Sequence, residues 1–256
     1  MSMPAGGQVV DTPAAREFLD RALERISRDQ CRAITAECAR KAAGLQRLLA
    51  AGRCATLGEA ELRTLLRAVF STRRRVDGVI EAAGGTRGLA QALDELAWDA
   101  APVAQRVDGF AGRLEPLGDP ELACDLAGEV LHHLHPRRLW LFSRWMWSPR
   151  LRTGALGLVT TDADLSGDTL GETYLKLGRT LVMLRASADA GGLLGLGEEP
   201  WDLDVLLACV YCVYLYTITR LRMTQEFNKV IPPLPELVRR FLGVHRLELE
   251  EAQPCR

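Results

Sequence analysis

The sequence predicts an all-α protein, a multi-helix globular bundle with one main core. Apolar residues recur with a helical period through most of the chain, and capping residues stand before several of these segments. Hydrophobic residues make up 48% and charged residues 25% of the 256 positions, as in ordinary globular domains. The longest apolar run, Val205–Ile218, is shorter than the ~20 residues that a membrane-spanning helix needs.

Six helical segments are expected before residue 136. The pair Thr12-Pro13 opens the first, whose apolar stripe runs to Gly52 as one long helix or as two helices joined near residues 28–29. Thr56 opens a capping box, and the apolar stripe behind it is the clearest in the chain. The expected ranges are 12–52, 56–70, 76–83, 86–96, 102–116 and 119–135, the last of which ends before Pro136.

The second half of the chain holds fewer and longer elements. Gly154–Thr161 is short, apolar and β-branched, so we interpret it as a connection that can form a short β-ribbon over 154–161. A helix is expected over Leu170–Leu184, followed by a glycine-rich loop at 191–197. Val205–Ile218 is predicted to be a buried central helix, and a short helix is expected before Gly243.

The predicted domain organisation is simple. Seven cysteines, an odd number without disulfide-scaffold spacing, and the lack of a secretory signal favour a reduced, cytoplasmic setting. The strong preference for arginine over lysine is typical of a GC-rich, bacterial-like genome. We expect a disordered N-terminus (1–11), a single helical domain (12–243, with a subdivision near 150–168 as the alternative) and an acidic C-terminal tail (244–256).

The stretch Val130–Thr161 has the most unusual composition in the chain. It contains no acidic residue but five arginines, three of the four histidines and three of the five tryptophans. Cations interleaved with aromatic faces can stack on bases or dock an anionic partner, whereas core tryptophans with arginines at helix ends produce the same pattern by packing alone. The candidate residues for an anionic ligand or protein partner are Arg137, Arg138, Trp140, Arg144, Trp145, Trp147, Arg150 and Arg152.

A second basic cluster is formed by Arg73, Arg74 and Arg75 at the end of a predicted helix. Cations are stabilised at helix carboxyl ends, so a solvated helix terminus explains the cluster without a ligand. The net charge of −1 gives no global attraction to nucleic acid. A nucleic-acid-binding module therefore requires this cluster and the Arg/Trp stretch to share one exposed face.

Polar residues on the helix before Pro136 suggest a weak metal site. Asp125, Glu129, His132 and His135 follow one another at spacings of 4, 3 and 3 residues, so that several can lie on one helical face. Stable metal sites usually need four or more ligands, and no second Glu-x-x-His pair occurs in the chain. A solvated helix face is the simpler interpretation, and a divalent metal completed by a partner is the alternative.

The pair Cys209 and Cys212 has the CxxC spacing of zinc and redox sites. It lies inside a continuous apolar run, where cysteine acts as a small hydrophobic residue. Both thiols are therefore expected to be buried and unreactive.

The function that this sequence favours is that of a non-catalytic cytoplasmic binding or accessory protein. The Arg/Trp/His-rich surface over 129–152 would bind a protein partner or a negatively charged ligand, with metal handling as a sharper version. A nucleic-acid-binding helical module is the second hypothesis. An enzyme comes third, because no phosphate loop, dinucleotide fingerprint, nucleophile elbow or His-Glu-x-x-His signature occurs.

Overall fold

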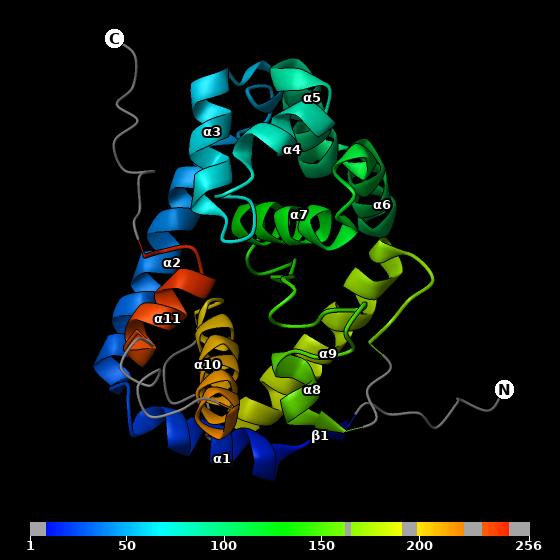
Figure 1. Cartoon of the computed structure of the whole chain (residues 1–256). Helices are drawn as coiled ribbons and strands as arrows, with labels where there is room; N and C mark the ends of the chain where they lie inside the picture. Colours follow the sequence, from blue (N-terminus) through cyan, green and yellow to red (C-terminus); the bar gives the residue numbers. More distant parts are fainter. Residues whose placement is uncertain (1–8, 162–164, 191–198, 223–231, 246–256) are drawn as a thin grey trace, which may run out of the picture.

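The computed structural model describes residues 9–161, 165–190, 199–222 and 232–245, without the side chains of 9, 188–190 and 219–222. It has an all-α globular fold in which one helix, α7 (Pro120–Leu134), crosses the middle of the molecule (Figure 1). The expected fold class is confirmed.

The other elements surround α7. Before it in the chain come α1 (Thr12–Leu23), α2 (Arg28–Leu48), α3 (Glu59–Ala68), α4 (Val76–Ala82), α5 (Gly85–Trp98) and α6 (Val103–Arg113), with 3-10 turns at Cys54–Thr56 and Glu115–Leu117. After it come α8 (Ala155–Val159), α9 (Leu170–Ala190), α10 (Asp202–Arg222) and α11 (Leu234–Phe241). Two short strands, β1 (Val9–Val10) and β2 (Thr160–Thr161), pair antiparallel.

The first expected segment is two helices, because a cap interrupts it. The Ser27 hydroxyl accepts a hydrogen bond from the Gln30 amide at 3.1 Å, and the Ser27 amide donates to the Gln30 side chain at 2.8 Å. This reciprocal capping box starts α2. The prediction of a capping box at Thr56 is wrong, because the N-cap of α3 lies two residues later, at Gly58, and the helix begins at Glu59. The Glu61 carboxylate accepts a hydrogen bond from the Gly58 amide.

The interpretation of 154–161 as a ribbon is correct only at its end. Ala155–Val159 forms the helical turn α8, and only Thr160–Thr161 is extended, paired with β1. Ala155, Leu156 and Val159 are buried, so the i, i+1 and i+4 positions face the core as a helix requires. Short apolar runs do not distinguish a buried turn of helix from a strand.

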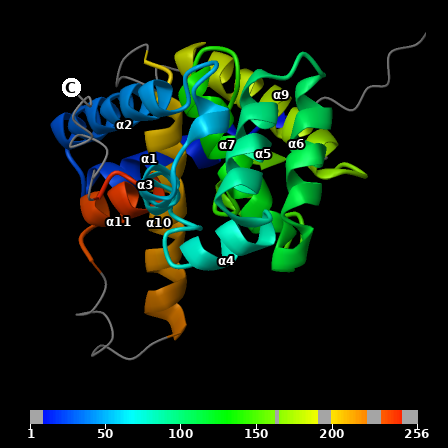
Figure 2. The ribbon, with the colours of Figure 1, turned by 90° about the horizontal axis from the view of Figure 1, so that it is seen from above.

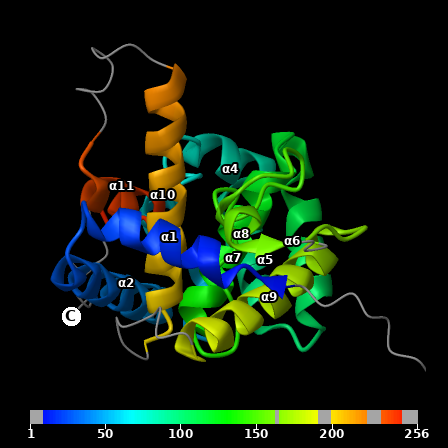
Figure 3. The same cartoon turned by 90° about the horizontal axis from the view of Figure 1, so that it is seen from below.

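Helices from both halves of the chain enclose α7. From the first half, α2, α5 and α6 pack against it, and Figure 2 shows α5, α6 and α7 side by side. From the second half, α10 reaches it through Asp204, which lies 2.8 Å from His132. On the other side of the bundle α1 crosses α10 (Figure 3), and α10 also contacts α2, α8 and α11. Consequently every residue of α7 from Glu121 to Leu134 is buried.

Several expectations about the chain ends and loops concern segments outside the described residues. These are most of the N-terminus expected to be disordered, the glycine-rich loop at 191–197 and almost all of the acidic tail. Within the part of the chain that the structure describes, none of the helices is long and apolar enough to cross a membrane.

The close contact between α7 and the chain that follows it provides a test of the fold. A methyl group added at Gly128 would lie 2.5 Å from the Phe142 carbonyl oxygen, whereas one added at Gly109 on α6 meets nothing within 4 Å. We expect Gly128→Ala to lower the free energy of unfolding by about 1–3 kcal/mol through overpacking. Gly109→Ala should raise it by roughly 0.5–1 kcal/mol, because alanine favours helix.

Urea denaturation of both variants measures this difference. Equal stabilities for Gly128→Ala and Gly109→Ala would contradict the packing of residues 141–147 against α7.

Candidate functional site

The polar stripe on α7 lies inside the protein. Asp125, Glu129 and His132 are each at most 2% exposed. The prediction of a solvated helix face is therefore wrong, because helices from both halves of the chain cover α7 and its polar residues have to be satisfied internally.

Glu129 forms a buried ion pair with Lys41 of α2. The Lys41 Nζ lies 2.7 Å from Glu129 Oε2 and donates a second hydrogen bond to the Leu242 carbonyl at 2.9 Å. Both charged side chains are almost completely shielded from solvent. Burial raises the pKa of Glu129, and the neighbouring Lys41 ammonium opposes that rise.

His132 links α7 to α10 and to the segment after α7. Its Nε2 lies 2.8 Å from Asp204 Oδ2, and its Nδ1 lies 2.8 Å from the Leu139 carbonyl oxygen. Burial lowers the pKa of His132, but Asp204 and the Leu139 carbonyl outweigh this effect and the net shift is upward. Because a carbonyl and a carboxylate both accept, His132 fits this site as an imidazolium with two donors.

His133 has the opposite electrostatic character. Its Nδ1 donates to the Glu129 carbonyl at 2.8 Å, and its ring stacks on Trp201 with the centroids 5.2 Å apart. Burial, followed by the charges of Lys41 and His132, holds the pKa of His133 well below its ordinary value. We call Lys41, Glu129, His132, His133 and Asp204 the buried charge network.

The proposed metal ligands are not brought together. Asp125 pairs with Arg144, Glu129 with Lys41 and His132 with Asp204, while His135 caps the end of α7. In the described residues no group of three or more histidine, cysteine or acidic side chains is arranged to hold a metal ion.

The residues of the Arg/Trp stretch lie at both ends of α7. The helix has 15 residues, so at 1.5 Å per residue its two ends are about 22 Å apart. At the amino end, the Arg144 amide and Nε each lie 2.6 Å from Asp125, and Arg144 Nη2 lies 3.3 Å from Asp119. Burial raises the pKa of Asp125 to about 7, although the charge and hydrogen bonds of Arg144 lower it. Arg150 faces Glu121 at 3.8 Å. Arg144 is thus a packing residue and not a solvated charge.

The tryptophans of this stretch belong mainly to the core. Trp145 is 2% and Trp147 is 8% exposed. The prediction that these two rings belong to a binding surface is therefore wrong. Trp140 is partly buried, and its amide and carbonyl both bond the Tyr174 hydroxyl. Large aromatic rings reach the core from a non-helical segment, which residue composition alone does not reveal.

The second basic cluster meets the amino end of α7. Arg75 Nη1 lies 3.3 Å from Asp119 Oδ2, so Asp119 bridges Arg75 and Arg144. Arg73 lies over the Phe70 ring at 4.6 Å, and Arg74 is exposed. The two basic segments therefore touch, but at a point where acids are interleaved with the arginines.

A small cavity lies at the carboxyl end of α7. Its volume is about 160 Å³, and it is lined by Arg106 of α6, His135, Arg138 and Leu139. None of these described lining residues carries a carboxylate. Burial, followed by the charges of Arg106 and Arg138, lowers the pKa of His135, while a backbone hydrogen bond with Ala97 opposes this.

The cavity is held in place by backbone contacts on both sides. Arg106 Nη1 donates to the carbonyls of Leu96 at 2.7 Å and Ala97 at 3.0 Å, at the end of α5. The amides of Arg138 and Leu139 both donate to the His135 carbonyl at 2.9 Å. Since the Leu139 carbonyl is itself fixed by His132, the buried charge network positions one wall of this cavity.

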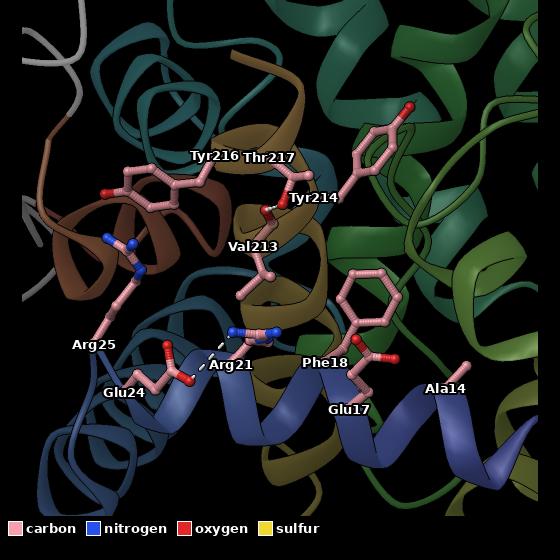
Figure 4. Close-up of a pocket in the computed structure, with 10 residues that line it drawn as sticks. All are labelled: Ala14, Glu17, Phe18, Arg21, Glu24, Arg25, Val213, Tyr214, Tyr216 and Thr217. Atoms are coloured by element: carbon pink, nitrogen blue, oxygen red, sulfur yellow. Dashed lines mark hydrogen bonds and ion pairs between the residues drawn. The ribbon is translucent and has the colours of Figure 1, made fainter. Parts of the chain in front are cut away.

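A larger groove of about 470 Å³ lies between α1 and α10, and its described lining residues come from these two helices and from Glu24 and Arg25, which directly follow α1 (Figure 4). Phe18 and Val213 supply apolar surface. The charged residues at its edge are Glu17, Arg21, Glu24 and Arg25, two of each sign. The described lining residues therefore carry balanced charges and give no net attraction for a charged ligand.

The CxxC pair is structural, as expected. Cys209 is 2% exposed and Cys212 is fully buried within α10. Burial raises the pKa of Cys212 far above that of a free thiol. Neither cysteine has the exposure or the thiolate character that reactivity requires.

Sequence patterns missed several of the residues that matter most. Lys41 and Asp204 lie 88 and 72 residues from their partners, and Arg106 lies on a helix that shows no unusual composition. Lys41, one of only three lysines, stands on the apolar side of α2 beside Cys38 and Leu45, which was a usable signal of a buried charge.

Comparison with known proteins supplies no template for these sites. No protein-family model matches the chain, and searches among curated proteins and solved structures found no significant similarity.

The buried ion pair gives a stability prediction. Lys41→Met leaves the Glu129 carboxylate buried without its partner, so we expect the free energy of unfolding to fall by about 3–5 kcal/mol. The double variant Lys41→Met/Glu129→Leu removes both charges and should recover most of this loss. Urea denaturation measures both, and a double variant as unstable as Lys41→Met would show that the pair itself, and not the unpaired charge, dominates.

The His132–Asp204 pair predicts a pH dependence of stability. Because the folded pKa of His132 is raised above its ordinary value near 6.5, its stabilising contribution is present below pH ~6.5 and is lost as the pH rises through the folded pKa. The stability difference between wild type and His132→Gln should therefore shrink as the pH increases. Denaturation between pH 5.5 and 9 measures it, with the more exposed His245→Gln as the control. A difference that grows with pH would contradict the ion pair.

Proposed function

We propose that the protein is a non-catalytic binding protein that recognises a negatively charged group with the surface at the carboxyl end of α7. The observation that carries the proposal is that Arg137 and Arg138 are exposed and form no ion pair with another described residue. They adjoin a cavity lined by two arginines and one histidine. A surface with unpaired guanidinium groups and no acid beside them attracts anions and orients them through paired hydrogen bonds.

The remaining arginines of the stretch support this choice by contrast. Arg144 is tied to Asp125 and Asp119, and Arg150 faces Glu121, so their charges are already offset within the fold. Free positive charge in the segment is concentrated in Arg137 and Arg138, together with Arg152 near the opposite end of α7. The proposed binding surface is therefore only that part of the expected 129–152 surface that lies next to His135.

The alternative functions have weaker support. A nucleic-acid groove needs a continuous basic face, whereas Arg73–Arg75 join the stretch at the amino end of α7, about 22 Å from Arg138 by the length of the helix. For catalysis, the closest histidine–carboxylate pair among the described residues is His132–Asp204, and it is almost fully buried. A metal-handling role has no described cluster of ligands behind it.

A charge-matched pair of double variants tests the proposal. We expect Arg137→Gln/Arg138→Gln to weaken anion binding at least about tenfold, since hydrogen bonds to charged groups contribute about 1.5–3 kcal/mol each. The control Arg150→Gln/Arg152→Gln removes the same charge at the other end of α7 and should leave affinity within about twofold. Unfolding free energies should change by at most ~1 kcal/mol per exposed charge.

The measurement is isothermal titration calorimetry with sulfate, phosphate, citrate and tripolyphosphate at constant ionic strength. The proposal is overturned if none of these probes binds, or if the two double variants weaken binding equally. A nonspecific basic surface gives the second result.

A further inference from the structure

We infer that the cavity formed by Arg106, His135, Arg138 and Leu139 binds a tetrahedral dianion, either the free phosphate ion or the phosphate monoester group of a small molecule. This inference rests on the proposed function and deepens it by naming the chemical class of the ligand. It also assigns ligand contacts to Arg106 and His135, in addition to the exposed pair Arg137 and Arg138.

Arg106 has an unused face for an oxyanion. Its Nη1 is taken by the carbonyls of Leu96 and Ala97, but its Nε is buried and has no hydrogen-bond partner in the described part of the chain. No contact of its Nη2 is found there either. The Nε and Nη2 groups on one edge of a guanidinium donate two parallel hydrogen bonds to a carboxylate or phosphate. A buried donor without a partner costs free energy, and a shift of the Arg106 side chain that opens Nε to the cavity would let a bound oxyanion recover it.

The other walls supply charge and fix the size. Arg138 adds donors from the segment after α7, His135 adds one when its ring is protonated because a neutral ring has a single donor, and Leu139 completes the lining. A volume of about 160 Å³ corresponds to roughly five water molecules at ~30 Å³ each. It is smaller than the ~300–1,000 Å³ of sites for drug-sized ligands. The cavity thus fits a compact oxyanion, while any larger remainder of the ligand would lie outside it.

The electrostatic balance favours an anion. The carboxyl ends of α5 and α7 each contribute about half a negative charge. Arg106 and Arg138 carry two full positive charges, which exceed the two half charges of the helix ends, and after burial these arginines are the groups that lower the pKa of His135. Trp98 of α5 meets the His135 ring edge to face at 5.6 Å and is uncharged. The charged groups that shift His135 are therefore the two arginines, and both act in the same direction.

A dianion in the cavity should raise the pKa of His135, whereas the two arginines lower it. Its negative charge favours the imidazolium, so ligand binding and protonation of His135 should strengthen each other. Affinity for the dianion is then expected to rise as the pH falls through the pKa of His135. A phosphate monoester takes up a proton at pH ~6 and inorganic phosphate closer to neutral pH, whereas sulfate stays a dianion, so sulfate isolates the contribution of His135.

The experiment follows the His135 ring by NMR and affinity by calorimetry, with sulfate, inorganic phosphate and glycerol 3-phosphate as probes. Saturating sulfate should raise the pKa of His135 above its value in chloride of equal ionic strength, which controls for salt screening of the arginines. Arg138→Gln should raise that pKa without ligand and abolish the further rise with sulfate. His135→Gln should remove the pH dependence of sulfate binding.

Arg106→Lys separates charge from geometry. Lysine keeps the positive charge but lacks the paired donors, so sulfate affinity should fall about tenfold or more. Arg152→Gln is the matched control for loss of one arginine and should bind sulfate like the wild type. Amide NMR spectra of the Arg106→Lys protein confirm that it is folded, and Arg138→Gln, on an exposed side chain, tests the cavity independently.

The two phosphate probes distinguish the sources of the ligand. Glycerol 3-phosphate binding as tightly as phosphate or more tightly identifies a monoester ligand, and its exclusion identifies the free ion. The inference is overturned if the pKa of His135 is the same in sulfate and chloride, or if Arg106→Lys and Arg138→Gln bind sulfate normally. If anions bind in a manner that depends on Arg137 and Arg138 while His135 does not respond, the proposed function stands and this cavity is not its site.

Discussion

The ion pair between Lys41 and Glu129 is the constraint around which the protein is arranged. Two charges removed from water have to be compensated within the fold, because each would otherwise cost several kcal/mol. The Lys41 ammonium is compensated by Glu129 of α7 and by the Leu242 carbonyl after α11, so one side chain of α2 fixes the positions of two other elements. Gly243 passes so close to the Lys41 Nζ that an added Cβ would lie 2.7 Å from it, and glycine also suits its positive φ.

The polar residues of α7 extend this principle along the helix. Asp125 is matched by Arg144, Glu129 by Lys41 and His132 by Asp204, so each carboxylate or imidazole specifies a different neighbour. An apolar helix of the same shape could rotate or slide with little penalty, whereas misplacing any of these pairs leaves a charge unsatisfied. Residues whose spacing resembles a metal site thus serve to define how the helices pack.

The same network connects the core to the surface where a ligand is proposed. His132 holds the Leu139 carbonyl from within, and the Arg138 and Leu139 amides close on the His135 carbonyl. Binding residues on a loop are more effective when a rigid scaffold fixes the loop. The two ends of α7 consequently differ: acids neutralise the arginines at its amino end, and at its carboxyl end Arg137 and Arg138 pair with no acid among the described residues.

The sequence by itself determined the helical class, most helix ranges and the burial of the CxxC pair, because periodicity, caps and apolar runs are local properties. It also singled out the stretch that contains His135 and Arg138. Only the tertiary structure decided that α7 is enclosed, that Trp145 and Trp147 are core residues, and that Arg106 joins His135. A buried charge and a solvated one have the same local pattern. Their difference lies in partners such as Lys41, 88 positions from Glu129, which only the folded chain brings within hydrogen-bond distance.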